Sequence, residues 1–149
     1  MVVTYTGSLG VAATDMLYSN GLKLSEFDPE LKEQLAALMP DYLNNQNPVD
    51  CSFSMTPEQV RTILEMGTRS SSVQSFMVII PGEKLCDFVD VMKDLDYRGK
   101  PVVCCVACKE FMMDSVIRME QAGIPVYSTP EMAAEVLGEM HRFATRRQR

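Results

Sequence analysis

Apolar positions along this chain follow two alternating patterns. Short continuous runs rich in Val, Ile, Phe and Tyr are typical of strands buried on both faces, and longer segments with apolar residues three and four positions apart are typical of amphipathic helices. The pattern predicts strands at residues 2–6, 22–27, 76–80, 102–106 and 124–127. Helices are expected over the apolar stripes that begin near Leu9, Leu31, Val60, Leu85, Phe111 and Met132.

Three of these predicted helices begin with the same three-residue signal. A capping side chain comes first, a proline takes the first helical position, and a glutamate places negative charge in the first turn. The signal occurs at residues 28–30, 56–58 and 129–131, and Gln59 completes a capping box with Thr56.

Strands separated by helices of about ten to fifteen residues imply a parallel sheet with helices on both faces. The sequence therefore predicts an α/β three-layer sandwich with about five parallel strands. Its 149 residues are the length of one ordinary domain. We assign residues 1–143 to this domain and residues 144–149 to a basic C-terminal tail.

The charge of the chain limits its partners. The net charge is −6, which argues against a broad nucleic-acid surface because phosphate contacts need clustered Lys and Arg. The basic cluster at the end is formed by Arg142, Arg146, Arg147 and Arg149. It is consistent with a nucleic-acid tail, but a solvated helix end is favoured because cations stabilise a helix C-terminus.

The sequence favours neither a membrane nor secretion. The longest apolar stretches, such as residues 73–81 and 101–108, are too short to span a bilayer. The chain opens on a strand-like run without the basic region and cleavage site of a signal peptide. Five cysteines, an odd number placed mostly in apolar runs, suit free thiols in a reducing compartment. We therefore expect a cytoplasmic protein.

Cys104, Cys105 and Cys108 lie close together in sequence and raise the question of a metal site. Zinc sites usually need four ligands, and the single histidine, His141, lies far along the chain. Adjacent strand residues also point to opposite faces of a sheet. We expect no metal site, buried apolar cysteines and a surface His141. Core filling is likewise expected of the methionines on apolar helix faces, Met112, Met113, Met119, Met132 and Met140.

The turn after the first strand is the strongest candidate for a binding site, because ligands of open parallel sheets bind beyond the carboxyl ends of the strands. It contains Thr6, Gly7, Ser8 and Gly10. Glycines let the backbone approach a ligand, free amides at a helix start attract an anion, and the two hydroxyls would add hydrogen bonds. Because no lysine completes a Walker-type loop, the turn predicts phosphate binding without nucleoside triphosphate hydrolysis. The alternative interpretation is that the turn is structural and binds no ligand.

Residues 47–50, Asn-Pro-Val-Asp, form a second candidate at the same edge. Proline stiffens this segment, and Asp50, with Asn47 in support, is expected to face the carboxyl ends of the strands. The alternative is that Asn47 or Asp50 caps a turn locally. A hydrolytic triad cannot be assembled, because His141 is remote from all the candidate loops, which include residues 81–84, 107–110 and 128–130. We therefore assign no catalytic residue and expect an anion-binding domain.

Several segments resemble, in order, the parts of one enzyme family. Residues 3–15 resemble its first strand, its Thr-Asn-Ser-Gly-Gly-Pro-Gly-Val turn and the Ala-Ala-Asp helix that follows. Residues 31–40 and 47–50 resemble its next helix and its Asn-Pro-Val-Asp signature. Residues 100–103, 122–127 and 129–131 complete the match. The family is the ADP-forming acyl-CoA (acetate–CoA) ligases, related to succinyl-CoA synthetase, and the resemblance covers nearly the whole chain.

The resemblance implies a flavodoxin-like CoA-ligase domain of an enzyme that makes an acyl-CoA, ADP and phosphate from ATP, CoA and a carboxylic acid. In that family an acyl-phosphate forms, and a phosphorylated histidine then carries the phosphate between distant sites. The histidine, the CoA-binding domain and the ATP-grasp domain lie elsewhere in the enzyme and would be the partners. Gly7, Ser8 and Gly10 would dock the phosphohistidine, and CoA, ATP and Mg²⁺ would be bound by the complete enzyme. Activity is not expected from this chain alone.

The turn differs from the family pattern at three positions. Tyr5 replaces an asparagine, Ser8 replaces the second glycine and Leu9 replaces the proline. The glycine-rich stretch after the fourth strand is replaced by residues 107–109. These changes leave the turn feasible.

Two other functions fit parts of the sequence. A flavodoxin-type electron carrier has a similar size, acidity and phosphate loop, but it needs aromatic residues in the later loops to sandwich FMN, and residues 81–84 and 107–110 contain none. The other alternative is a non-catalytic interaction module without a ligand, which binds partner subunits through its Met-rich helices.

Overall fold

The computed structural model describes residues 1–107 and 109–147. Five parallel strands form one sheet in the order β2-β1-β3-β4-β5, which confirms the predicted parallel sheet. β3 and β4 pair along their full length, from Phe76 beside Val102 to Ile80 beside Val106. The strands are β1 (Val2–Thr4), β2 (Val49–Asp50), β3 (Phe76–Ile80), β4 (Val102–Val106) and β5 (Val126–Tyr127).

The expected helices are all present in the described residues: α1 (Gly7–Ser19), α2 (Pro29–Leu38), α3 (Pro57–Arg69), α4 (Leu85–Lys93), α5 (Met113–Gln121) and α6 (Pro130–Arg147). Short 3₁₀ turns, η1 (Gly82–Lys84) and η2 (Lys109–Met112), precede α4 and α5. The predicted caps form: the Asp28 carboxylate accepts the Leu31 N–H, and Thr56 with Gln59 makes a complete capping box.

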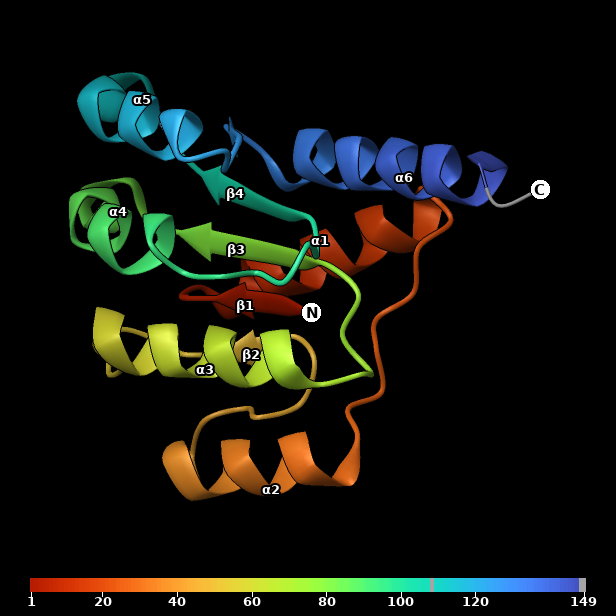
Figure 1. Cartoon of the computed structure of the whole chain (residues 1–149). Coiled ribbons are helices and arrows are strands. Elements are labelled where there is room, and N and C mark those ends of the chain that lie inside the picture. Colours follow the sequence, from red (N-terminus) through yellow and green to blue (C-terminus); the bar gives the residue numbers. More distant parts are fainter. Residues whose placement is uncertain (108, 148–149) are drawn as a thin grey trace.

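Helices cover both faces of the sheet (Figure 1). One apolar core joins the sheet to α3, α4 and α5, with α2 packed outside α3, and the other joins it to α1 and α6. Neighbouring strand residues alternate between these cores, so Cys104 lies in the first and Cys105 in the second. The three-layer sandwich and the apolar role of these two cysteines are confirmed, whereas Cys108 lies outside the described residues.

The strand predicted at residues 22–27 is wrong. This segment has no regular structure, and the position beside β1 is occupied by β2. Its strand-like pattern has another origin: Leu22 and Leu24 pack against the core under α1 and α6, and Phe27 lies in the opposite core. The apolar pattern correctly indicated that these side chains are buried. They are buried beside the sheet, however, in a segment that does not pair with any strand.

Methionine burial was predicted correctly only in part. Met119 is fully buried and Met112 is half-buried, but Met113, Met132 and Met140 are 46%, 49% and 42% exposed. The prediction is wrong for these three, because a large part of each side chain is open to solvent.

The end of the chain is helical for most of its length. α6 runs to Arg147, so residues 144–147 of the expected tail continue the helix, and residues 148–149 lie outside the described part. Figure 1 shows the second half of α6 extending past the amino ends of β3 and β4, beside the end of α1. Within the described residues, we find no helix with the length and apolar character needed to cross a membrane.

Candidate functional site

The turn between β1 and α1 lies at the point where the strand order reverses. All five strands are parallel, so the loops after them meet at one edge of the sheet. From β1 the chain passes to β2 on one side, and β3 then lies on the other side of β1. In sheets of this topology the crevice at this point is the usual ligand site. The structure thus brings the sequence-predicted turn to the expected position.

The N-terminus of α1 is open. Thr6 is the N-cap residue and is extended, with φ −138° and ψ 105°. Among the described residues no side chain caps α1, and its first turn carries no acidic residue. Gly7 and Ser8 are exposed, so their N–H groups and the positive end of the helix dipole face the edge of the sheet. The capped N-termini of α2 and α3 differ from α1 in this respect.

Thr4 stabilises this turn through hydrogen bonds to Thr6, a role that was not predicted from the sequence. Its side chain is buried, and its hydroxyl donates to the Thr6 carbonyl at 2.8 Å and accepts the Thr6 N–H at 2.9 Å. The Tyr5 N–H continues the sheet by donating to the Ile79 carbonyl at 3.2 Å. The signal available in the sequence was a hydroxyl at the last strand position, two residues before the helix cap.

Gly10 has a packing role in this structure. It is buried, and its N–H donates to the Thr6 carbonyl at 3.1 Å inside the first helical turn. A Cβ at this position would lie 2.9 Å from Thr4 Cγ2 and 3.5 Å from Pro48 Cβ. Glycine therefore lets α1 approach β1 and the segment before β2 closely. The free amides of the turn are those of Gly7, Ser8 and their helical neighbour Leu9.

Asp50 lies beside the turn, as the sequence analysis expected. It ends β2 opposite Thr4, and a Cβ on Gly7 would come within 2.7 Å of Asp50 Oδ2. Its other oxygen accepts the Ser52 N–H at 3.0 Å, in a loop where Ser52 has a φ of 49°. Asp50 therefore both caps its own turn and lies at the carboxyl edge of the sheet. A carboxylate stands next to the positive end of α1.

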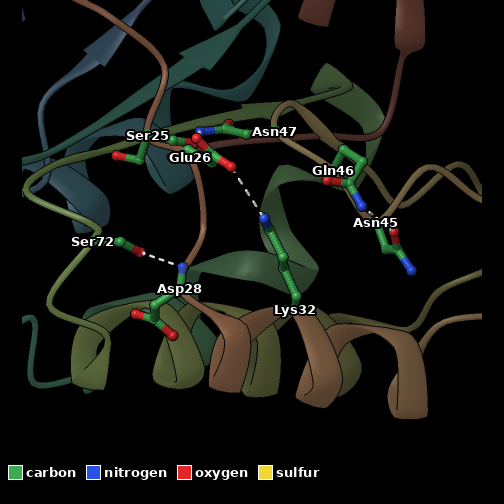
Figure 2. A network of polar contacts seen from close by, with 8 residues as sticks. All are labelled: Ser25, Glu26, Asp28, Lys32, Asn45, Gln46, Asn47 and Ser72. Carbon is green, nitrogen blue, oxygen red and sulfur yellow. Dashed lines mark hydrogen bonds and ion pairs between the residues drawn. The ribbon is translucent and has the colours of Figure 1, made fainter.

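Asn47 lies at the other end of β2, away from the turn. Its Oδ1 accepts the Val2 N–H at 2.9 Å, and its Nδ2 donates to the Ser25 carbonyl at 3.1 Å. Figure 2 shows Asn47 beside Ser25, on the segment that leads to the capping residue Asp28. There the Asp28 N–H donates to Ser72 Oγ at 3.2 Å. Asn47 thus fastens the irregular segment 22–28 to the amino end of β1.

Two groups beneath the site are unsuited to proton transfer at neutral pH. Tyr5 is buried, donates to the Met55 carbonyl at 2.6 Å and packs edge-on against Phe88, and burial raises the pKa of its phenol. Burial, and secondly the charge of Asp50, raises the pKa of the Cys51 thiol to about 12. Cys51 therefore stays a thiol rather than a nucleophilic thiolate.

A hollow of the described surface lies at the opposite edge of the sheet. It has a volume of about 670 Å³ and is lined by Val2, Leu22, Leu137 and His141, among others. None of the six predicted site residues lines it. His141 is exposed there, as predicted, and is remote from the turn. Groups of three or more potential metal ligands are absent from the described residues.

Comparison with protein families gives one match along the whole chain. Residues 1–149 match the model of the Ligase-CoA domain. An ADP-forming acetate–CoA ligase (II) of Archaeoglobus fulgidus is 30% identical over 98% of this chain. The alpha subunit of ADP-forming acetate–CoA ligase I of Pyrococcus furiosus is 24% identical over 97% of it. The chain spans only 23% and 32% of the length of these two relatives.

Solved structures show the same fold. A protein from Pyrococcus horikoshii superposes with a TM-score of 0.80 and 23% identity, over 92% of this chain and 33% of that one. Acetyl-coenzyme A synthetase 1 of Candidatus Korarchaeum cryptofilum also gives 0.80, with 22% identity, over 99% of this chain and 34% of that one. At these identities the likeness concerns the fold, and it confirms the predicted flavodoxin-like architecture.

Proposed function

The chain belongs to the Ligase-CoA domain family, and from that premise we propose that it is one domain of a nucleoside-diphosphate-forming acyl-CoA synthetase. Such an enzyme makes an acyl-CoA, ADP and phosphate from ATP, CoA and a carboxylic acid. The part proposed for this domain is to offer the N-terminus of α1 to the phosphohistidine of a partner domain. The setting proposed for it is the cytoplasm.

The open N-terminus of α1 is the observation that carries this proposal. The amides of Gly7, Ser8 and Leu9 begin a helix of 13 residues, and a phosphate placed there would meet several donors and the positive end of the dipole. The Ser8 hydroxyl, which is exposed, adds one more donor. Fixed donors of this kind stabilise a migrating phosphoryl group because they need no reorganisation when it arrives.

Asp50 has a separate part in the proposal. Its carboxylate lies beside Gly7 and would accept a ring N–H from the imidazole that carries the phosphate. In the absence of that imidazole, the same carboxylate repels a free phosphate at the turn. The arrangement thus favours a phosphate delivered on a histidine over inorganic phosphate.

The remaining chemistry is assigned to partners. As the resemblance to the ligase family implies, ATP, Mg²⁺ and CoA are proposed to bind an ATP-grasp domain and a CoA-binding domain, outside this chain. The length of the relatives supports such partners, and the family match favours this function over a flavodoxin-type carrier.

A phosphate titration followed by NMR tests the docking site. Inorganic phosphate is expected to shift the amide signals of Gly7, Ser8 and Leu9, while Gln59, in the capped first turn of α3, serves as the control inside the same protein. Ser8→Glu is expected to abolish the shifts because it places a fixed anion at the turn. Equal shifts at both helices, or none at α1, would contradict the proposal.

A further inference from the structure

The hollow at the amino edge of the sheet (the amino-edge hollow) has an apolar floor. Val2 lies there at the start of β1, Met77 lies near the start of β3, and Leu137 adds the buried side of α6. The half-buried Leu22 and Leu24 form part of one wall. The volume of about 670 Å³ is in the range of small-molecule sites. The hollow is therefore suited to a ligand with an apolar part.

One wall of the amino-edge hollow is the irregular segment 21–25, which Figure 1 shows leaving the end of α1. The Leu22 N–H donates to the Leu17 carbonyl at 3.0 Å, and this bond holds the segment at its beginning. The Ser25 carbonyl accepts Asn47 Nδ2 at 3.1 Å, and this bond holds it at its end. Because the segment pairs with no described strand, it lies beside the sheet and leaves the hollow between them.

The other wall is the second half of α6. Met140, His141 and Ala144 line the hollow from this helix. Arg142 Nη1 donates to the Asn20 carbonyl at 3.1 Å, and this bond ties the helix to the end of α1. With both walls anchored, the hollow is largely preformed, which lowers the entropy cost of binding a ligand.

The ionisable side chains that line the amino-edge hollow are basic. They are Lys23 and His141, both exposed, and the described lining contains no Asp or Glu. Among the described residues, neither side chain has a hydrogen-bond or ion-pair partner. An ammonium group and an imidazole ring from two different elements therefore border the same apolar floor.

The acidic residues nearest to Lys23 and His141 along the chain are paired with other cations. Glu26 forms an ion pair with Lys32 at 3.4 Å, as Figure 2 shows. Glu139 forms an ion pair at 2.7 Å with the same arginine that anchors α6. Although the chain has a net charge of −6, its amino-edge hollow thus offers a positive charge and a ring N–H to an anion.

We propose that the amino-edge hollow binds a small monocarboxylate with a short apolar chain. The carboxylate pairs with the Lys23 ammonium and accepts a ring N–H from His141. The apolar chain lies on the floor formed by Val2, Met77 and Leu137. An uncharged ligand would forgo the charge of the ammonium, and an inorganic anion would leave the apolar floor in water, so both fit the hollow less well.

The proposed carboxylate site is separate from the turn between β1 and α1. The residues of that turn do not line the hollow, which lies at the other end of the parallel strands. Binding of a carboxylate here neither requires nor prevents binding of a phosphate at α1. The carboxylate site and the phosphate site can therefore be tested independently.

An NMR titration of the 149-residue chain with hexanoate tests the carboxylate site. Hexanoate is expected to shift the amide signals of Lys23, Leu24 and His141 with a dissociation constant of about 1 mM, as for other ligands of this size. Acetate lacks the apolar chain and hexanol lacks the charge, so each should bind at least about tenfold more weakly. Equally tight binding of acetate or hexanol, or no shift at these amides, would overturn the proposal.

Removal of the positive charge tests the head-group contact. Lys23→Gln is expected to weaken hexanoate binding about threefold or more, because the carboxylate loses its ion-pair partner. Lys93→Gln makes the same change of charge at an exposed position of α4 and is the matched control, which should bind as the wild-type chain does. Wild-type affinity in Lys23→Gln would contradict the assigned contact.

A carboxylate placed in the hollow tests its location. Ala144→Glu is expected to abolish hexanoate binding, because it fills the hollow with a like charge. Ala36→Glu, at an exposed position of α2, is the matched control and should leave binding unchanged. Circular dichroism checks that each variant stays folded. Normal binding by a folded Ala144→Glu variant would show that hexanoate binds elsewhere and would overturn the proposal.

Discussion

The Asp50 carboxylate lies against Gly7 at the first turn of α1, so closely that a Cβ on Gly7 would come within 2.7 Å of Asp50 Oδ2. This contact joins the end of β2 to the helix start that follows β1. It places a negative charge at the positive end of a helix whose N-terminus is otherwise uncapped within the described residues. The two residues therefore control both the electrostatics and the packing of the proposed site.

Asp50→Asn should strengthen the binding of free phosphate. The amide keeps the shape of the side chain and can still accept the Ser52 N–H, but it removes the charge beside the turn. At a separation of about 5 Å and intermediate screening, this corresponds to a roughly five- to tenfold tighter dissociation constant at low salt. The NMR titration measures it, with Asp15→Asn, on an exposed position further along α1, as the control. Weaker phosphate binding by Asp50→Asn would contradict the repulsion.

Gly7→Ala should destabilise the domain through Asp50. The new methyl group displaces the carboxylate and strains its bond to Ser52, which should lower the free energy of unfolding by about 1 kcal/mol. In an Asp50→Ala background the same change should be nearly neutral, because the clashing oxygen is gone. Urea denaturation of the four proteins gives the coupling energy. Additive effects would show that the two residues do not interact.

Gly10→Ala should destabilise more strongly, because the group it meets is a buried methyl. Its Cβ would lie 2.9 Å from Thr4 Cγ2, and overpacking of this kind costs about 1–3 kcal/mol. Thr4→Ser removes that methyl while keeping the hydroxyl that holds Thr6. The double variant should therefore recover part of the loss in urea denaturation. If the double variant does not recover stability, the strain lies at another contact of residue 10, for instance with Pro48.

Asn47→Ala should reduce stability without affecting phosphate. It removes the bonds to the Val2 N–H and the Ser25 carbonyl, and a half-buried backbone group left unpaired costs about 1–3 kcal/mol. Gln46→Ala, at the exposed neighbouring position, is the control and should be near neutral. Thermal unfolding and the phosphate titration together separate the two roles. If the Asn47→Ala variant has a changed phosphate affinity and an unchanged stability, Asn47 contributes to phosphate binding after all.

Buried thiols should resist alkylation and make the fold sensitive to alkali. Burial raises the pKa values of Cys51 and Cys105 to about 12, from 9.0, so the folded state keeps protons that the unfolded state loses. Stability should be unaffected by these groups below pH 9 and should fall as the pH rises from 9 to 12. Iodoacetamide at pH 8, read by mass spectrometry, should modify the exposed Cys86 before the buried Cys51, Cys104 and Cys105. Rapid labelling of Cys51 would contradict its burial.

Much of the local structure follows from nearby residues. The prolines and capping side chains at residues 28–30 and 56–58 act within one helical turn, so the starts of α2 and α3 could be predicted from the sequence. The buried runs that form β3 and β4 are apolar on both faces, which only a covered parallel sheet explains. The turn at Thr6 and Gly7 was identified for the same local reason.

Other features depend on contacts between distant segments. β2 has only two residues, which is too short for an apolar pattern to be recognised. It occupies the position beside β1 that was predicted for residues 22–27. The roles of Asn47 and Asp50 separated because they lie at opposite ends of this strand. Exposure of Met113, Met132 and Met140 could not be predicted either, since helical spacing shows which side is apolar but not whether a neighbour covers it.

The sequence by itself determined the alternation of strands and helices, the position of the turn proposed to bind an anion and the resemblance to the ligase family, because propensity, capping and motif spacing are local properties of the chain. The tertiary structure alone decided that the Asp50 carboxylate lies directly against Gly7, that Gly10 serves close packing and that α6 keeps an apolar side in solvent. These features arise where β1, β2 and α1, or α1 and α6, meet across long sequence separations, and no local pattern records such contacts.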